Sequence, residues 1–164
     1  MNATQIGVSI LTISDRAAAG TYNDESGPVL EHAVAGRGWT LMTTRIVPDD
    51  MAEIQTAILE MVEQEGCTLV LTTGGTGVAP RDVTPEAVRG IAAKELPGFG
   101  ELMRIDSMKI SRHAMLSRNM AAVVGRALVV CLPGTPKGAG ECLSFVAGLI
   151  PHAVALINEI PTEH

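Results

Sequence analysis

Short apolar runs alternate with amphipathic segments along most of the chain. Residues 5–13 (QIGVSILTI) form a nearly continuous apolar run of strand length, and residues 68–72 (TLVLT) form a shorter one. Strands that are buried on both faces of a parallel sheet have this pattern. Further strands are expected at residues 39–47, 120–124 and 127–132. These runs predict a mostly parallel sheet.

Helices are predicted between the strands from capping signals and helical spacing. Asp50 and Glu53 have the spacing of a capping box, and apolar residues recur at helical spacing up to residue 64. Thr84 is expected to be an N-cap, with Pro85 at the first helical position. Other helices are expected at residues 28–35, after residues 96–98 through residue 108, and after Pro136, where a long C-terminal helix is kinked at Pro151.

The alternation of strands and helices predicts one α/β domain over residues 1–164: a three-layer α/β/α sandwich around a mostly parallel sheet. The sequence shows no linker, repeat or low-complexity stretch. Aromatic residues make up only 2% of the chain, so the core must consist of aliphatic and methionine side chains. In such sheets ligands bind beyond the carboxyl ends of the strands, which directs attention to the loops there.

Charge and composition exclude several classes of protein. The formal net charge is −6 at pH 7 and no Lys/Arg-rich block is present, which argues against nucleic acid as the main partner. The three cysteines, Cys67, Cys131 and Cys142, are expected to be reduced and buried. No leader segment is seen and the apolar runs are too short to span a bilayer, so we expect a soluble cytoplasmic protein without a membrane partner.

The strongest local signal is the segment at residues 72–86 (TTGGTGVAPRDVTPE). Gly74, Gly75 and Gly77 directly follow a buried strand, where glycine allows unusual dihedrals and close approach to a ligand. With Thr76 between them, successive N–H groups of this turn would form an anion nest. The segment is not a Walker A motif, and a merely tight turn is an equally good interpretation of the glycines alone.

Two carboxylates lie close to this segment in the predicted fold. Asp82 follows Arg81 in the loop before a helix start, where an aspartate commonly serves as a cap or turn residue. Alternatively, Asp82 would bind Mg²⁺, which prefers one or two carboxylates together with phosphate oxygens. Asp49 follows the second strand and has no evident structural duty, because Asp50 makes the capping box; an ordinary solvated aspartate is the alternative.

The other loops at this sheet edge supply further polar groups. Asp24 and Ser26 lie at this edge, where either could simply cap the next helix. Lys137 in a first helical turn opposes the helix dipole, which suggests that it meets an anion. Ser107, Ser117 and Arg118 fall in an irregular region whose default interpretation is a surface loop. The remaining candidates in these loops are Ser14, Asp15, Pro133 and Gly134.

Taken together, these motifs resemble the MogA/MoaB family of molybdenum cofactor biosynthesis, which includes the G domains of gephyrin-like proteins. The resemblance covers nearly the whole chain. In order, its motifs are LTISDR (residues 11–16), IVPDD (46–50), LVLTTGGTGVAPRDVTPEA (69–87), LPGFGELMR (96–104), MLSR (115–118) and LVVCLPGTPKG (128–138). The long central motif is highly specific.

The resemblance implies a three-layer fold, usually trimeric, that transfers AMP from ATP to the terminal phosphate of molybdopterin and releases pyrophosphate. Asp49 and Asp82 correspond to the aspartates regarded as essential, with a role in holding Mg²⁺. Gly74, Gly75, Thr76 and Gly77 correspond to the loop that holds phosphates. Ser107, Ser117 and Arg118 map onto the pterin-binding side, and a downstream molybdenum-insertion enzyme is an expected partner.

Three alternatives remain at this point. Some members, of the MoaB type, bind molybdopterin without activity, but they tend to lose the RDVTP pattern that this chain retains. A related domain of nicotinamide-nucleotide or competence-damage proteins would carry extra domains for which 164 residues leave no room. A scaffold role, as in gephyrin relatives, would need partner domains.

Overall fold

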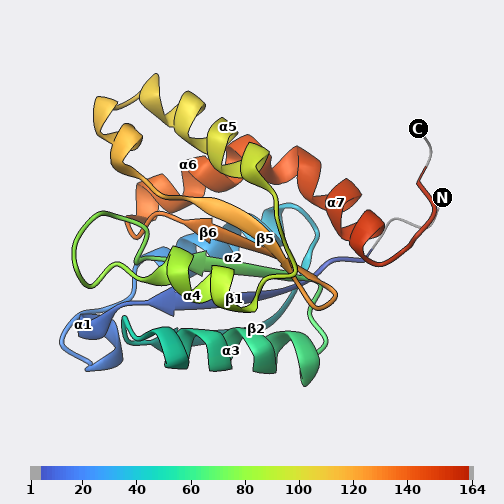
Figure 1. The fold of residues 1–164 in the computed structure, drawn as a ribbon, viewed down its shortest axis with the longest axis horizontal. Coiled ribbons are helices and arrows are strands. Elements are labelled where there is room, and N and C mark those ends of the chain that lie inside the picture. Colours follow the sequence, from blue (N-terminus) through green and yellow to red (C-terminus); the bar gives the residue numbers. More distant parts are fainter. Residues whose placement is uncertain (1–4, 163–164) are drawn as a thin grey trace.

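The computed structural model describes residues 5–162 and contains one six-stranded sheet in the order β2-β1-β3-β6-β5-β4 (Figure 1). The strands are β1 (Gly7–Ile13), β2 (Thr40–Val47), β3 (Leu69–Thr73), β4 (Lys94–Glu95), β5 (Met120–Val124) and β6 (Ala127–Leu132). Strands β2, β1, β3 and β6 are parallel, whereas β5 pairs antiparallel with both β6 and β4. The prediction of a mostly parallel sheet is confirmed.

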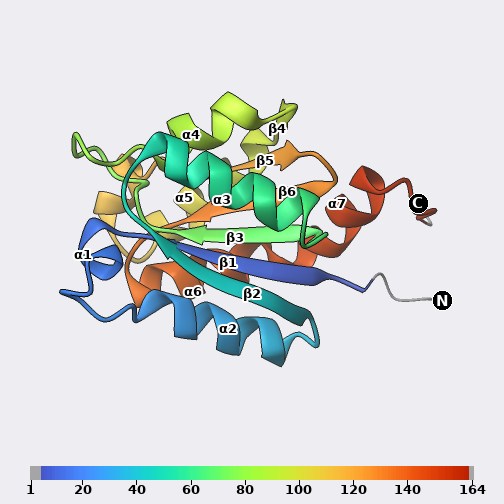
Figure 2. The same cartoon turned by 90° about the horizontal axis from the view of Figure 1, so that it is seen from below.

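Helices cover both faces of the sheet, which confirms the three-layer α/β/α prediction (Figures 1 and 2). Helices α2, α5, α6 and α7 pack on one face, and α3 and α4 pack on the other. Their bounds are α1 (Asp15–Ala18), α2 (Ser26–Gly36), α3 (Met51–Glu63), α4 (Thr84–Ile91), α5 (Pro97–Met108), α6 (Pro136–Val146) and α7 (Ile150–Ile157), with 3₁₀ turns η1 (Arg112–Leu116) and η2 (Ala147–Leu149).

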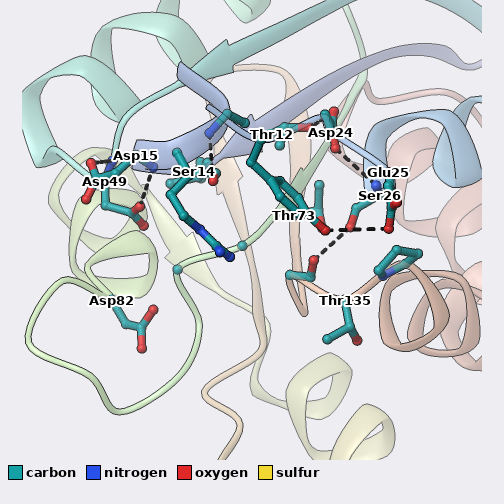
Figure 3. A pocket seen from close by; sticks show the side chains of 18 residues that line it. Thr12, Ser14, Asp15, Asp24, Glu25, Ser26, Asp49, Thr73, Asp82 and Thr135 are labelled. Carbon is teal, nitrogen blue, oxygen red and sulfur yellow. Dashed lines mark hydrogen bonds between the residues drawn. The ribbon is translucent and has the colours of Figure 1, made fainter. Parts of the chain in front are cut away.

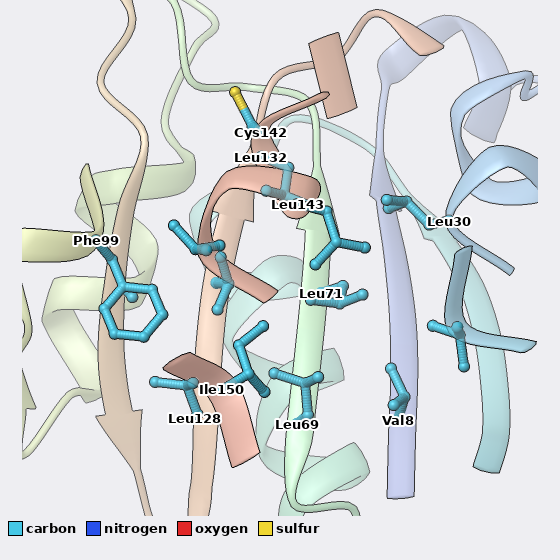
Figure 4. Close-up of a cluster of buried hydrophobic side chains, with 14 of the residues drawn as sticks. Val8, Leu30, Leu69, Leu71, Phe99, Leu128, Leu132, Cys142, Leu143 and Ile150 are labelled. Carbon is cyan, nitrogen blue, oxygen red and sulfur yellow. The ribbon is translucent and has the colours of Figure 1, made fainter. Parts of the chain in front are cut away.

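The alternation of side chains along the central strands divides the core into two clusters. Along β1, Val8 and Ile10 face α2 and the C-terminal helices, while Leu11 and Ile13 face α3. Figure 4 shows the first cluster, in which Leu69 and Leu71 of β3 lie between the side chains of β1 and those of β6. Each central strand is therefore buried on both faces, as the continuous apolar runs predicted.

The site-forming edge follows from the strand order. From β1 the chain runs through α2 on one face to β2, then through α3 on the other face to β3, which pairs with the opposite side of β1. The carboxyl ends of β1 and β3 are thus a topological switch point, where loops diverge and leave a crevice.

Several local expectations need correction. No pattern of apolar or capping residues predicted α1, β4 or η1, all of which are very short. Thr84 is not the N-cap of α4: Val83 holds that position, and the buried Thr84 hydroxyl instead donates to the Gly74 carbonyl at 2.9 Å. The Asp50 cap is confirmed, because its carboxylate accepts the Glu53 N–H at 3.0 Å.

The C-terminal helix is interrupted where proline predicted a kink. The 3₁₀ turn η2 separates α6 from α7, and Pro151 stands in the first turn of α7, where its missing N–H costs no hydrogen bond. Taken as one helical run, Pro136–Ile157 is the single described segment long and apolar enough to cross a membrane. The expectation of uniformly short apolar runs is therefore wrong here, although a core helix meets the same criterion and this one packs on the sheet.

Leu71 offers a direct test of the two-sided core. Its side chain is fully buried at the centre of β3, so Leu71→Ala should lower the free energy of unfolding by about 2–5 kcal/mol. Leu156→Ala is the control, since Leu156 is 53% exposed on α7 and should cost less than about 1 kcal/mol. Urea unfolding measures both; equal losses would contradict the packing described.

Candidate functional site

An open cleft of about 510 Å³ lies at the carboxyl ends of the parallel strands. The loops after β1, β2, β3 and β6 and the start of α2 line it. Figure 3 shows Asp15 and Asp49 on one side of the cleft and Asp24 and Ser26 on the other, with Asp82 on the glycine-rich loop. This is the edge that the strand pattern indicated.

Glycine is required where the loops after β3 and β6 meet β1. Gly74 has φ +103°, and a Cβ there would lie 2.2 Å from the Ile13 carbonyl oxygen. Gly134 follows β6, and its Cβ would come 3.2 Å from the Gly74 Cα. At Gly75, with φ +66°, a Cβ would meet the Thr84 hydroxyl at 2.2 Å and an Asp49 carboxylate oxygen at 3.2 Å. Three strand ends therefore approach closely.

The same turn contains backbone N–H groups that pair with no described residue, and its Gly75 lines the cleft. The Gly74 N–H is used internally, because it donates to the Leu132 carbonyl at 3.2 Å. Within residues 5–162, the N–H groups of Gly75, Thr76 and Gly77 donate to no other residue. Successive unpaired amides can form an anion nest, and anion binding by this turn stays a prediction. The Thr76 side chain itself is buried.

Asp15 and Asp49 hold each other in place across two loops. The Asp15 N–H donates to Asp49 at 2.9 Å, and the Asp49 N–H donates to Asp15 at 3.0 Å. Arg81 reaches over from the glycine-rich loop and donates to both Asp15 oxygens, from Nε at 2.9 Å and Nη2 at 2.7 Å. A fork-like guanidinium contact of this kind defines the geometry of both partners.

These contacts shift the pKa of the two carboxyl groups in opposite directions. Burial raises the pKa of Asp49 above its ordinary value, and the nearby charges of Asp15 and Asp82 add to the increase. Hydrogen bonds from Arg81 lower the pKa of Asp15. The Asp49 carboxylate is therefore destabilised in its charged form and would gain from a cation.

Asp82 is held by the turn that carries it. Its Oδ2 accepts the Ala79 N–H at 2.8 Å and lies against Gly77, where a Cβ would be 2.7 Å away. No described residue donates to the Oδ1 of Asp82 or to the Oδ1 of Asp49. Each carboxylate thus has one fixed oxygen and one oxygen available to a ligand.

The cleft fits a hard cation that arrives with an anionic ligand. No group of three or more metal-binding side chains exists among residues 5–162, so the protein offers no complete cage. Mg²⁺ is commonly held by one or two carboxylates while phosphates and waters supply the other ligands. Asp15, Asp24, Glu25, Asp49 and Asp82 all line the cleft, so a polyphosphate without a cation would be repelled.

Asp24 lies opposite these groups and has a structural duty. Its Oδ1 accepts the N–H groups of Ser26 and Gly27, both at 3.0 Å, at the start of α2. Its Oδ2 accepts the Thr12 hydroxyl at 2.6 Å. Capping, the simpler interpretation, therefore describes its contacts, although Asp24 also lines the cleft. Ser14 is likewise both a cleft residue and a cap, because it accepts the Ala17 N–H.

Thr12 is a cleft residue that sequence reasoning missed, and Ser26, expected at this edge as a polar group or a cap, lines the cleft as well. Ser26 donates to the Gly134 carbonyl at 2.7 Å, which joins α2 to the loop after β6. Thr73, also missed, donates to the Pro133 carbonyl at 2.7 Å. Thr12 and Thr73 are polar residues at the ends of apolar strands, and that position is a signal that could have identified them.

A second cavity of about 450 Å³ adjoins the first and shares Thr135 with it. Ser107, Ser117, Pro133 and Lys137 line it, so several predicted residues are brought together there. The Lys137 side chain is 77% exposed, with its ammonium 3.8 Å from Glu141. Gly134 and Thr135 line the first cavity, so the loop after β6 separates and connects the two.

Arg118 lies beside neither Thr135 nor Lys137. Its guanidinium donates to the carbonyls of Gly77 and Asp82, both at 2.7 Å, and pairs with Glu86. It lines a smaller cavity, which shares Arg104, Ser117 and Asn119 with the second cavity. The structure thus brings Arg118 to the back of the glycine-rich loop, whereas a contact with a pterin stays a prediction.

Known proteins resemble this chain over nearly its whole length. Residues 9–152 match the family described as probable molybdopterin binding domain. The chain is 42% identical over 154 residues to a molybdopterin adenylyltransferase of Helicobacter pylori (93% of this chain, 88% of the relative). It is 44% identical over 148 residues to that of Escherichia coli (89% and 75%). The crystal structure of the molybdopterin biosynthesis enzyme MoaB from Thermus thermophilus superimposes with a TM-score of 0.90 at 40% identity (97% and 100%).

Substitution of Gly75 tests the close approach at the cleft. Gly75→Ala should lower the free energy of unfolding by about 1–3 kcal/mol, since the residue has positive φ and its Cβ would press on Thr84 and Asp49. Gly98→Ala is the matched control: no atom lies within 4 Å of its Cβ, and it should stabilise α5 by up to about 1 kcal/mol. Thermal unfolding that treats both alike would contradict this geometry.

The opposed pKa shifts predict opposed effects on stability. Above its raised pKa, ionised Asp49 destabilises the fold, so Asp49→Asn should raise the urea midpoint at pH 7. The gain should disappear as pH falls through the raised pKa toward the ordinary value. Asp15→Asn should lower the midpoint at pH 7, and this loss should fade as pH falls through the lowered folded pKa. A change of the urea midpoint in the same direction for both variants at pH 7 would contradict the opposed pKa shifts of Asp49 and Asp15.

Proposed function

This chain belongs to the family of probable molybdopterin binding domains, and from that premise we propose that it is a molybdopterin adenylyltransferase acting in molybdenum cofactor biosynthesis. The observation that carries the proposal is the pair of adjoining cavities, one acidic and lined by backbone donors, the other richer in apolar surface. A nucleoside triphosphate and a phosphorylated heterocycle need two such compartments. Their phosphates would meet near Thr135, which lines both cavities.

The proposed reaction is a displacement at phosphorus. An oxygen of the molybdopterin phosphate attacks the α-phosphorus of ATP, the bond from that phosphorus to the bridging oxygen breaks, and pyrophosphate leaves. The attacking phosphate is already ionised at neutral pH, so no general base is required. Catalysis then consists of positioning and of neutralising charge. Unpaired backbone amides and carboxylates are groups that can meet this requirement.

The first cavity supplies the groups for the triphosphate. The unpaired amides of Gly75, Thr76 and Gly77 would bind phosphate oxygens, and Arg81, which is bonded to Asp15 in the free protein, lies on the same loop. Asp49 and Asp82 would hold Mg²⁺ through their unpaired Oδ1 atoms. When bound, the ion neutralises triphosphate charge. Ser14, Asp15 and Asp24 shape the walls around the nucleotide.

The second cavity supplies the groups for the pterin. Ser107 and Ser117 offer hydroxyls to its heterocycle, and Lys137 stands near the connection to the first cavity with its ammonium exposed. Pro133 lines the second cavity and Gly134 lines the first, so this turn lies between the two proposed binding compartments. Binding without turnover was the alternative; the retained Asp49 and Asp82 support the enzyme.

Three finer features belong to the same proposal. We infer a homotrimer, a cytoplasmic location and transfer of the product to a molybdenum-insertion enzyme, each from the resemblance described above. The exposed apolar side chains of β2, Leu41, Met42 and Ile46, are compatible with a subunit contact.

Pyrophosphate release tests the proposed reaction. With Mg²⁺ and ATP, release should require molybdopterin, and both Asp49→Ala and Asp82→Asn should reduce kcat by about 10²-fold or more through loss of charge neutralisation. Asp50→Asn is the matched control: asparagine caps helices as well as aspartate, so α3 and the activity should be retained.

Two results would count against it. Pyrophosphate release independent of the pterin would indicate another acceptor. Tight pterin binding without release in any variant would indicate a binding protein. Excess Mg²⁺ should partly restore Asp82→Asn, since weakened metal binding is the expected defect.

A further inference from the structure

Arg118 is bonded to three separate points of the segment that carries Asp82. Its Nε donates to the Gly77 carbonyl at 2.7 Å and its Nη2 to the Asp82 carbonyl at 2.7 Å. Its backbone N–H donates to the Thr76 carbonyl at 2.8 Å. One residue outside the glycine-rich loop thus satisfies acceptors at both ends of the turn between Gly77 and Asp82.

This turn has little else to hold it. Val78 is 68% exposed, and residues 79–81 are exposed as well, so no apolar side chain anchors the turn to the core. Inside the turn, Ala79 and Asp82 bond to each other, and Thr84 donates to the Gly75 carbonyl at 3.1 Å. Those bonds shape the turn but do not connect it to the sheet. Arg118, which lies two residues before the first residue of β5, makes that connection together with Arg81.

Glu86 completes the arrangement from α4. Its Oε1 accepts the Arg118 Nη1, while its Oε2 is buried without a partner among the described residues. Burial is the largest single influence and raises the pKa of Glu86, but the hydrogen bond from Arg118, a backbone hydrogen bond and the charges of Arg118 and Arg89 together lower the net pKa. The ion pair is part-buried, with side chains 32% and 41% exposed, so it is screened less than a fully solvated pair.

We propose that Glu86 and Arg118 form a clasp that positions the Asp82 loop for the nucleotide, so that Arg118 acts through the loop and not by contact with the pterin. The proposal rests on the function proposed above and deepens it, because it assigns positioning residues to the phosphate side of the reaction. The neighbours of Arg118, Ser117 and Asn119, line the second cavity. The clasp therefore also joins the wall of that cavity to the loop of the first.

The test compares Arg118→Lys and Glu86→Gln with the control Glu95→Gln. Lysine keeps the charge but cannot reproduce a planar fork that serves several acceptors. Glu86→Gln keeps the shape of the side chain and leaves Arg118 and the loop carbonyls that it binds unchanged. This variant therefore still tests the clasp if Arg118→Lys fails to fold. Glu95 of β4 pairs at 2.9 Å with Arg89, which lies at the other end of α4 from Glu86. This ion pair has similar exposure and does not contact the loop.

Binding and exchange are measured without turnover. Titration with Mg²⁺ and a non-hydrolysable ATP analogue, in the absence of pterin, should show affinity weakened about 10-fold in both clasp variants and unchanged in Glu95→Gln. Amide hydrogen exchange at Ala79, Asp82 and Thr84 should accelerate only in the clasp variants. In the full reaction kcat should fall about 10- to 100-fold, while the KM for molybdopterin changes less than about 2-fold.

The clasp is contradicted if the variants bind the analogue and exchange the loop amides like the wild type but have a raised KM for molybdopterin. That result would make Arg118 a pterin contact. If the wild-type protein binds the analogue but releases no pyrophosphate, the proposed function is wrong. The binding and hydrogen-exchange measurements would still test the clasp in that case.

Discussion

The backbones at the ends of β1, β3 and β6 pack so closely that side chains are excluded between them. Gly74 lies against the Ile13 carbonyl, and Gly134 lies against Gly74. Because these strand ends meet, the loops that follow them are brought to one cleft, which Gly75 of the glycine-rich turn and Asp49 after β2 both line. A side chain at Gly74 would separate β3 from β1 and with it the donors from the acidic groups.

This arrangement is electrostatically unfavourable because it places several carboxylates close together. Asp49 is partly buried beside Asp15 and Asp82, and its pKa is raised, whereas Arg81 is already engaged by Asp15. The free protein therefore carries an acidic cleft that is only partly neutralised. Repulsion between neighbouring carboxylates is expected at sites that bind a cation with an anionic ligand, because the bound cation relieves the repulsion. A protein of net charge −6 would need such a cation to bind a polyphosphate at this cleft.

Much of the fold could be predicted because its signals are local. Apolar runs marked β1, β3 and β6, the Asp50 cap marked α3, and prolines marked α4 and the break before α7. The edge that carries the site followed from parallel strand order. Contacts between distant segments could not be predicted: Ser26 to Gly134, the pairing of Asp15 with Asp49, and the direction of Arg118 depend on three-dimensional packing. No pattern in the sequence distinguishes an arginine that binds a ligand from one that binds a loop.

The central claim is that AMP is transferred from ATP to the phosphate of the pterin at the edge where these strands meet. Tracing labelled phosphorus tests it most directly, with ATP that carries the label at the α-position, Mg²⁺ and molybdopterin. The account predicts that the label appears on the pterin product in proportion to pyrophosphate released. Label recovered only as free AMP or ADP, or left in ATP while the pterin stays bound, would contradict it.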